Sequence, residues 1–196
     1  MIMTTKKKQI VIDQKIINAF RKGELWAFEL IYQEISLFIY NVVFKMIRSK
    51  EETEDLTHDI FIKLYNNSVK FNGSVKLTTW AYRIAVNHTL NHIKRKKTLG
   101  SKLADLLFHN NTVVDDHKKI EYEDTKKMVH DILSHIKPEF RICLILREFE
   151  GQSYHDIADI LKISLGTVKS RISRAKSEFL QLYNQLVGGQ NYVKTY

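Results

Sequence analysis

Apolar residues recur at helical spacing along most of the chain, and this pattern predicts an all-α protein. The densest apolar pattern lies in residues 24–48 and predicts one long buried helix. One Pro and 7 Gly leave few breakers in such helices. Further helices are predicted over residues 11–21, 51–67, 78–97, 122–136 and 138–149.

The segment Gly151–Lys176 predicts two more helices joined by a tight corner. Ser153 is a good N-cap with Asp156 three residues later, and Ser164 caps the second helix. Small hydroxyls and cations share the outer face of that helix, where they can contact phosphates and base edges. The pattern predicts a helix-turn-helix whose second helix enters the major groove, although a solvated basic face would look similar. The outer face carries Thr167, Lys169, Ser170, Arg171, Ser173, Arg174 and Lys176, and the inner face carries Leu165, Val168, Ile172 and Ala175.

The charge balance favours an anionic partner. The chain has 31 basic and 22 acidic residues, which give a formal charge of +9 and favour nucleic acid or a membrane surface. The sole cysteine, Cys143, cannot form an internal disulfide and is expected to be a buried small hydrophobe. No apolar run approaches the length of a membrane span, and Asp13 interrupts any signal-like segment. We therefore expect a cytoplasmic chain without membrane insertion.

Periodicity weakens between Thr98 and Lys119, and this change predicts a boundary. We interpret residues 1–97 and 121–187 as two small helical domains, joined by a flexible linker over 98–120. The second domain contains the helix-turn-helix. Residues 188–196 are expected to form a loose tail.

Two stretches of the first domain carry candidate binding faces. In Glu54–Tyr65 an acidic face with an apolar residue suits docking on a basic partner, although spacing alone favours a solvated face. In Phe71–Lys97 a row of polar side chains recurs at helical spacing: Arg83, Asn87, Asn91 and Lys94 or Arg95. Cations, amides and nearby aromatic rings are the components of single-strand recognition, and we favour that function over a solvated helix end.

Three segments resemble, in order and spacing, the extracytoplasmic-function (ECF) class of bacterial RNA polymerase sigma factors. They are EDLTHDIFIKLY, FNGSVKLTTWAYRIAVNHTLNHIKRKK and IKPEFRICLILREFEGQSYHDIADILKISLGTVKSRISRAK. The resemblance covers about residues 23–183 and implies a sigma-two and a sigma-four domain. It implies transcription initiation without enzymatic activity, cofactor or metal. The implied partners are core RNA polymerase, through its β′ clamp helices and β flap, promoter DNA and an anti-sigma factor.

The resemblance also implies roles for individual residues. The segment that docks on the clamp helices includes Asp55, Asp59, Ile60 and Ile62. At the minus-ten element, a pocket for a flipped base is shaped by Phe71, Asn72 and Gly73. Asn87 contacts the strand, and its phosphates are held by Arg83, Lys94 and Arg95. The minus-thirty-five readers are Arg147, Thr167, Lys169, Ser170, Arg171, Arg174 and Lys176.

Some positions depart from the family pattern. His58 stands where Gln is common, Tyr65 where Trp is frequent, and the loop lacks the acidic residue often seen after Gly73, which leaves its base preference open. Two other functions are weighed. A DNA-binding activator would have no need of a strand-reading first domain. A metal-dependent nuclease built on Asp115, Asp116 and His117 would lack a scaffold that fixes ligand geometry.

Overall fold

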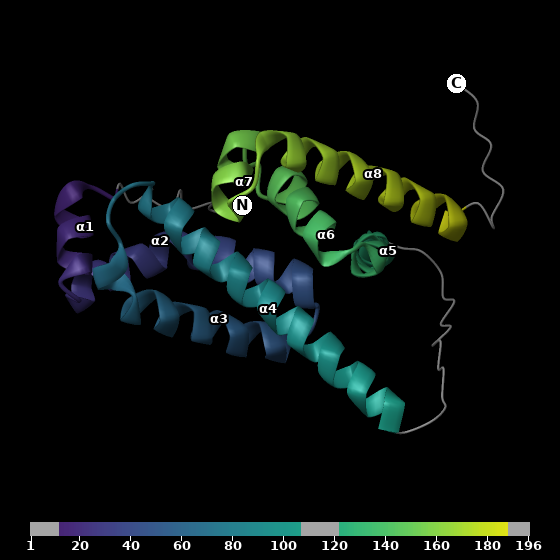
Figure 1. Cartoon of the computed structure of the whole chain (residues 1–196), viewed down its shortest axis with the longest axis horizontal. Helices are drawn as coiled ribbons and strands as arrows, with labels where there is room; N and C mark the ends of the chain where they lie inside the picture. Colours follow the sequence, from purple (N-terminus) through teal and green to yellow (C-terminus); the bar gives the residue numbers. More distant parts are fainter. Residues whose placement is uncertain (1–11, 107–121, 188–196) are drawn as a thin grey trace, which may run out of the picture.

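The computed structural model of the chain describes residues 12–106 and 122–187, and this part of the chain is helical throughout apart from its connections (Figure 1). The all-α prediction is therefore confirmed. The elements are α1 Gln14–Arg21, α2 Leu25–Ile47, α3 Lys50–Asn66, the 3-10 turn η1 Ser68–Lys70, α4 Leu77–Leu106, α5 Tyr122–His135, α6 Pro138–Leu144, the π-helical turn η2 Ile145–Phe149, α7 Tyr154–Leu161 and α8 Leu165–Val187.

Local side-chain chemistry sets the helix ends. The Asp13 carboxylate accepts a hydrogen bond from the amide of Ile16 at 2.9 Å and starts α1. Arg48 ends α2 in the left-handed conformation, with φ 68°, and the chain turns directly into α3. Ser153 and Asp156 form the predicted capping box at the start of α7.

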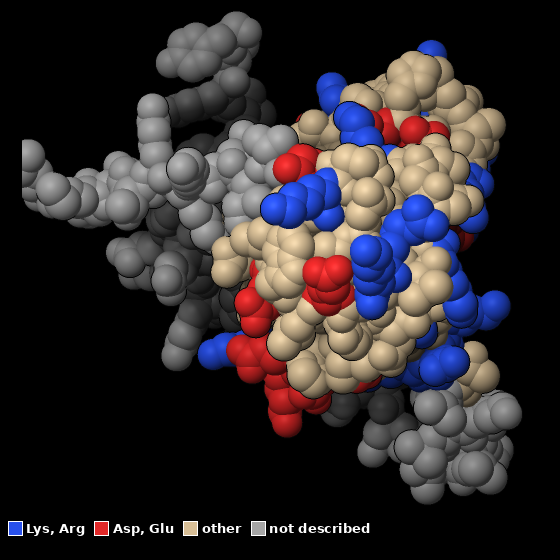
Figure 2. All heavy atoms as spheres, turned by 90° about the vertical axis from the view of Figure 1, so that its left-hand side faces the viewer, with Lys and Arg blue, Asp and Glu red and all other residues tan. Residues whose placement is uncertain are grey.

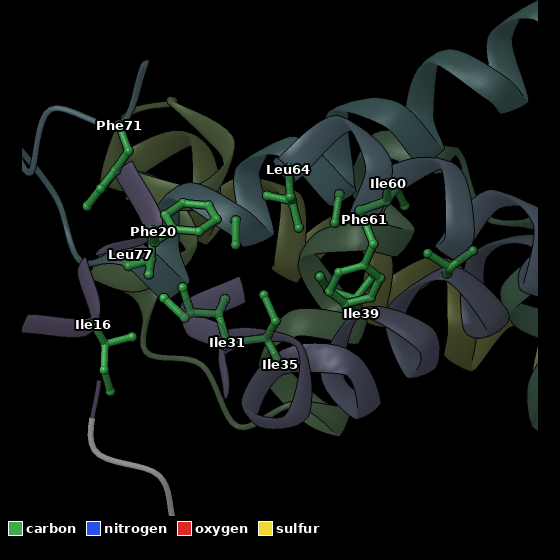
Figure 3. Packing of buried hydrophobic residues seen from close by; sticks show 14 of the residues in the cluster. Ile16, Phe20, Ile31, Ile35, Ile39, Ile60, Phe61, Leu64, Phe71 and Leu77 are labelled. Carbon is green, nitrogen blue, oxygen red and sulfur yellow. The ribbon is translucent and has the colours of Figure 1, made fainter. Parts of the chain in front are cut away.

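The first core lies among α1, α2, α3 and α4 (Figure 3). Ile35 and Ile39 of α2 are fully buried there, beside Ile60 of α3. By length and composition α2 could cross a membrane, so the expectation that no segment reaches that length is wrong. The buried face of α2, packed against α3 and α4, accounts for this apolar composition without a membrane.

A second core joins the two halves of the chain. Val42 and Met46 of α2 and Val86 of α4 pack with Ile145 of η2 and Ile157 of α7, all at most 3% exposed. Figure 1 shows α6 and α7 beside the layer that contains α2 and α4, with α8 on their far side. The two halves therefore form a closed arrangement around a shared apolar interface.

The structure corrects one helix end and leaves other predictions untested. α4 continues to Leu106, whereas the sequence pattern ended this helix at Lys97. Residues 1–11, residues 107–120 of the predicted linker with Asp115, Asp116 and His117, and the predicted tail 188–196 lie outside the described residues.

Candidate nucleic-acid and polymerase interfaces

The outer face of α8 is positioned by its inner face. Val168, Ile172 and Ala175 are at most 2% exposed, as predicted, and they turn Lys169 and Ser170 toward solvent. The Ser164 hydroxyl caps the helix by accepting from the amide of Thr167 at 3.1 Å. Leu165, predicted to be buried, is only half-buried.

Several of the predicted minus-thirty-five readers already have partners within the protein. The Arg147 guanidinium donates to the Gln152 carbonyl at 3.0 Å. The Arg174 guanidinium lies 5.8 Å from the centre of the Phe140 ring. Lys176 pairs with Glu148 at 2.8 Å.

Two other predicted readers differ sharply in their surroundings. Arg171 is half-buried. The nearby Cys143 thiol donates to the Glu139 carbonyl at 3.3 Å. Cys143 is buried, as expected, and burial raises the pKa of its thiol to about 11. Lys169 is exposed and has no polar partner among the described residues, so it is the cation of this face most available to a ligand.

A shallow trough of about 340 Å³ lies between the C-terminal end of α3 and the first half of α4. Asn87 and Asn91 of the predicted row line it, together with Trp80, which also packs on the first core. Sequence analysis missed two of its cations, Lys63 and Lys70. These residues come from α3 and η1, so helical spacing within α4 gave no signal for them.

His88 is another lining residue that sequence analysis missed. Its Nδ1 lies 3.1 Å from the Lys63 ammonium. Burial, reinforced by the charge of Lys63, lowers the pKa of His88, which favours a neutral ring that accepts from Lys63. The trough therefore combines cations, amides and an aromatic ring, which is the chemistry that unpaired bases require.

The loop before α4 is anchored by the buried side chain of Phe71. Phe71 is 1% exposed and its ring centre lies 5.4 Å from that of Trp80, so in this conformation it can shape the loop only from beneath, and its assignment to the minus-ten element stays a prediction. Its ring supports the loop. Asn72 is exposed, and its side chain accepts from the Ser74 amide at 3.0 Å. Gly73 has φ 78°, a backbone conformation that favours glycine.

The remaining cations of α4 do not share one environment. The Arg83 guanidinium donates twice to the Asp159 carbonyl of α7, from Nε at 3.1 Å and from Nη2 at 2.6 Å. Lys94 and Arg95 are exposed. The structure therefore separates Arg83, which serves the contact between the halves, from Asn87 in the trough.

The structure shows which residues of the predicted docking face on α3 are exposed. Ile60 is completely buried in the first core, so it cannot contact a partner and that assignment is wrong. Asp55 and Asp59 are exposed, and Ile62 is 47% exposed. An apolar groove of about 330 Å³ lies beside them, lined by Leu25, Phe28, Tyr32, His58, Phe61, Ile62 and Tyr65.

The space-filling view shows how charge is distributed over one end of the molecule. Basic side chains gather along one side of this end, and acidic side chains gather at the opposite lower corner (Figure 2). No group of three His, Cys, Asp or Glu side chains among the described residues could hold a metal ion.

Comparison with known families identifies the class that this fold and these faces define. Residues 31–98 match the sigma-70 region 2 family, and residues 126–179 match the family described as Sigma-70, region 4. The chain is 30% identical over 173 residues to the RNA polymerase sigma-H factor of Pseudomonas aeruginosa, with 84% of this chain and 90% of the relative covered. The chain belongs to the ECF class of RNA polymerase sigma factors.

A second curated relative and two solved structures are also similar to this chain. The ECF RNA polymerase sigma factor SigW of Bacillus subtilis is 30% identical, with 83% of this chain and 92% of the relative covered. The structure of CnrH in complex with the cytosolic domain of CnrY aligns with a TM-score of 0.67 at 16% identity, over 89% of this chain and 99% of the other. The sigma factor RpoE of Bartonella quintana, solved with the anti-sigma factor NepR, aligns with a TM-score of 0.62 at 22% identity, over 80% and 96% of the two chains.

The family decides between the functions weighed from the sequence. The chain is a transcription-initiation factor and not an enzyme, which removes the nuclease alternative. A region 2 domain accompanies the helix-turn-helix of region 4, which removes the alternative of an activator that carries DNA-reading helices alone.

Proposed function

We propose that the region 2 half, residues 1–97, reads the unpaired minus-ten strand through the trough between α3 and α4. The single observation that carries this proposal is the convergence of Lys63, Lys70, Asn87 and Asn91 around Trp80. Stacking on aromatic rings and salt-dependent phosphate contacts together bind single strands. Asn72 and Gly73 shape the adjoining loop, and Lys94 and Arg95 extend the basic track along α4.

The region 4 half, residues 121–187, is proposed to read the minus-thirty-five element through α8. Lys169, Ser170 and Thr167 lie at the exposed start of the helix, with Arg171, Arg174, Lys176 and Arg147 nearby. A helix that enters the major groove presents its N-terminal residues to base edges. In this proposal residues 98–120, which include the end of α4, separate the two halves in the sequence, and residues 188–196 follow the second half.

Core RNA polymerase is the proposed partner of two exposed apolar grooves. The groove beside Asp55, Asp59 and Ile62 suits the β′ clamp helices, because its acidic rim complements a basic partner. A second groove of about 310 Å³, lined by Leu144, Phe149, Phe179 and Leu180 with Glu148 and Lys176, suits the β flap. An anti-sigma factor is a further proposed partner, because one neighbour in structure, the sigma factor RpoE, was solved with the anti-sigma factor NepR. Action with polymerase implies a cytoplasmic protein.

The experiment is a comparison of Lys63→Gln with Lys76→Gln in holoenzyme on duplex and pre-opened promoter templates. Lys76 is an exposed cation at the start of α4 and does not line the trough. We expect Lys63→Gln to weaken binding to the pre-opened template and to lower the slope of affinity against salt by about 1. Equal behaviour of the two variants on the pre-opened template would contradict the proposed trough.

A further inference from the structure

A second polar hollow, distinct from the trough, lies between the two halves of the chain. Its volume is about 310 Å³, and it forms where α2 ends, α3 begins and α6 faces α4. Ile47 and Ile93 supply an apolar wall, and Arg141 enters from α6. We call this hollow the interdomain crevice. Neither the strand-reading nor the polymerase-docking assignment uses it.

Arg141 is the most unusual side chain of the crevice. It is only 6% exposed, and its Nε has no hydrogen-bond partner within residues 12–106 and 122–187. Burial lowers the pKa of the Arg141 guanidinium, although an arginine stays protonated at physiological pH. The described residues provide it with no ion pair. A buried charge without a counter-ion is costly, so this position calls for an anion.

The one carboxylate of the crevice is already occupied. Glu52 accepts from the Lys96 ammonium at 2.6 Å and lies 3.2 Å from His92 Nε2. Hydrogen bonds from Lys96 and His92 lower the pKa of Glu52, so its charge is committed to them. Lys97 is exposed and has no partner among the described side chains. Three cations therefore face one carboxylate, which leaves a surplus of positive charge.

We propose that the interdomain crevice binds a small phosphate-bearing anion, held by Arg141 from the second domain and Lys97 from the first. A guanidinium fork matches the oxygens of a phosphate, and the ammonium adds a point charge. The volume lies at the lower end of the range of small-molecule pockets, about 300–1,000 Å³. The wall of Ile47 and Ile93 can cover an attached apolar group.

The position of the crevice gives this anion a conformational effect. Its ligands come from α4 and α6, on the two sides of the shared apolar interface. A ligand that contacts both halves binds the closed arrangement better than an open one, so it shifts the population toward closure. The anion therefore stabilises the closed chain by RT ln(1 + L/Kd), where L is its concentration, so the stabilisation rises with the logarithm of that concentration once it exceeds the dissociation constant.

The test uses the full chain and three probes: inorganic phosphate, inorganic pyrophosphate and guanosine diphosphate, each at constant ionic strength. We expect saturable one-to-one binding of at least one probe by calorimetry, with a concentration-dependent rise in Tm. Tighter binding of the nucleotide than of pyrophosphate would show that the apolar wall contributes, and equal binding would show recognition of the phosphate group alone. Saturable binding of none of the three overturns the proposal.

Variants locate the site. We expect Lys97→Gln to weaken binding about 10-fold and Arg141→Gln to abolish it. Lys76→Gln removes the same charge at the other end of α4 and should leave binding unchanged. If Arg141→Gln does not fold, the comparison of Lys97→Gln with Lys76→Gln decides. Equal weakening by these two lysine variants would show generic charge screening and overturn the site.

Discussion

Mutation of the ion pair between Lys45 and Glu150 tests the closed arrangement directly. The Lys45 ammonium donates to the Glu150 carboxylate at 2.9 Å across the junction of α2 and η2. The two side chains are only 17% and 9% exposed, so solvent screens the pair weakly. Lys45 also lies 5.5 Å from the Phe149 ring centre, which adds a cation–π contact.

The structure sets the size of the effect. At 2.9 Å and an effective dielectric constant of about 20, the attraction is about 5.7 kcal/mol before desolvation is subtracted. Desolvation removes much of this energy, and we expect a net coupling of about 1–3 kcal/mol. Glu150→Lys replaces attraction by repulsion. It should shift the balance between closed and open chains toward open by at least about 5-fold, since 1.4 kcal/mol is a factor of 10.

The assay is a distance measurement between spin labels at Lys70→Cys and Ser177→Cys, both exposed sites on opposite halves. Cys143 is buried and should remain unlabelled. We expect Glu150→Lys to broaden and lengthen the distance distribution. The swap Lys45→Glu with Glu150→Lys should restore it in part, because the charges match again but the contact with Phe149 is lost. An unchanged distribution in Glu150→Lys, or no recovery in the swap, would refute the reasoning.

Three further outcomes are expected. Asn87→Ala should spare closed-complex binding but weaken binding to pre-opened template by about 1–3 kcal/mol, and wild-type affinity on that template would contradict it. Burial and the charges of Arg48 and Lys45 lower the pKa of His130, so the free energy of unfolding should be highest above about pH 6.5 and fall at lower pH. Urea titrations should show that this fall is shallower in His130→Phe and unchanged in His155→Phe. Iodoacetamide at pH 8 should modify Cys143 only as the chain unfolds, since its pKa is about 11.

Local signals explain why so many elements could be predicted. Ser153 and Asp156 satisfy free amides at the start of α7 without help from distant residues. Leu56, Ile60 and Leu64 recur at helical spacing and lie on one buried face of α3. The docking role of Ile60 rested on the family resemblance alone, whereas its spacing puts it in phase with the core. A residue in phase with the core cannot also serve as an exposed contact.

Other features depend on residues far apart in sequence or on tertiary support. The trough combines Lys63 of α3 and Lys70 of η1 with α4, and no single periodic pattern contains all three elements. The end of α4 was predicted at Lys97, but the helix continues through Gly100 to Leu106. A helical glycine costs only about 1 kcal/mol relative to alanine, so neither it nor a run of cations is sufficient to stop a helix.

The contact between Arg83 and Asp159 joins residues 76 positions apart, and it bears directly on how the chain works. Arg83 was assigned to strand phosphates, yet its guanidinium is committed to the Asp159 carbonyl in the closed arrangement. The edge formed by Nε and Nη2 cannot serve α7 and a strand phosphate at once. Closure is further supported by Val42, Met46 and Val86, whose burial stabilises by about 1.5–3 kcal/mol each for a full side chain.

The candidate polymerase surfaces do not share this conflict. Ile62 is 47% exposed on α3 and Leu180 is 58% exposed on α8 while the chain is closed. Polymerase can therefore engage either surface before the halves separate, whereas DNA cannot recruit Arg83 until they do. A partner that binds both surfaces at a separation larger than the closed chain permits has differential affinity for the open form. We expect docking to come first, opening second and strand binding by Arg83 third, with the shared apolar interface setting the free energy that docking must exceed.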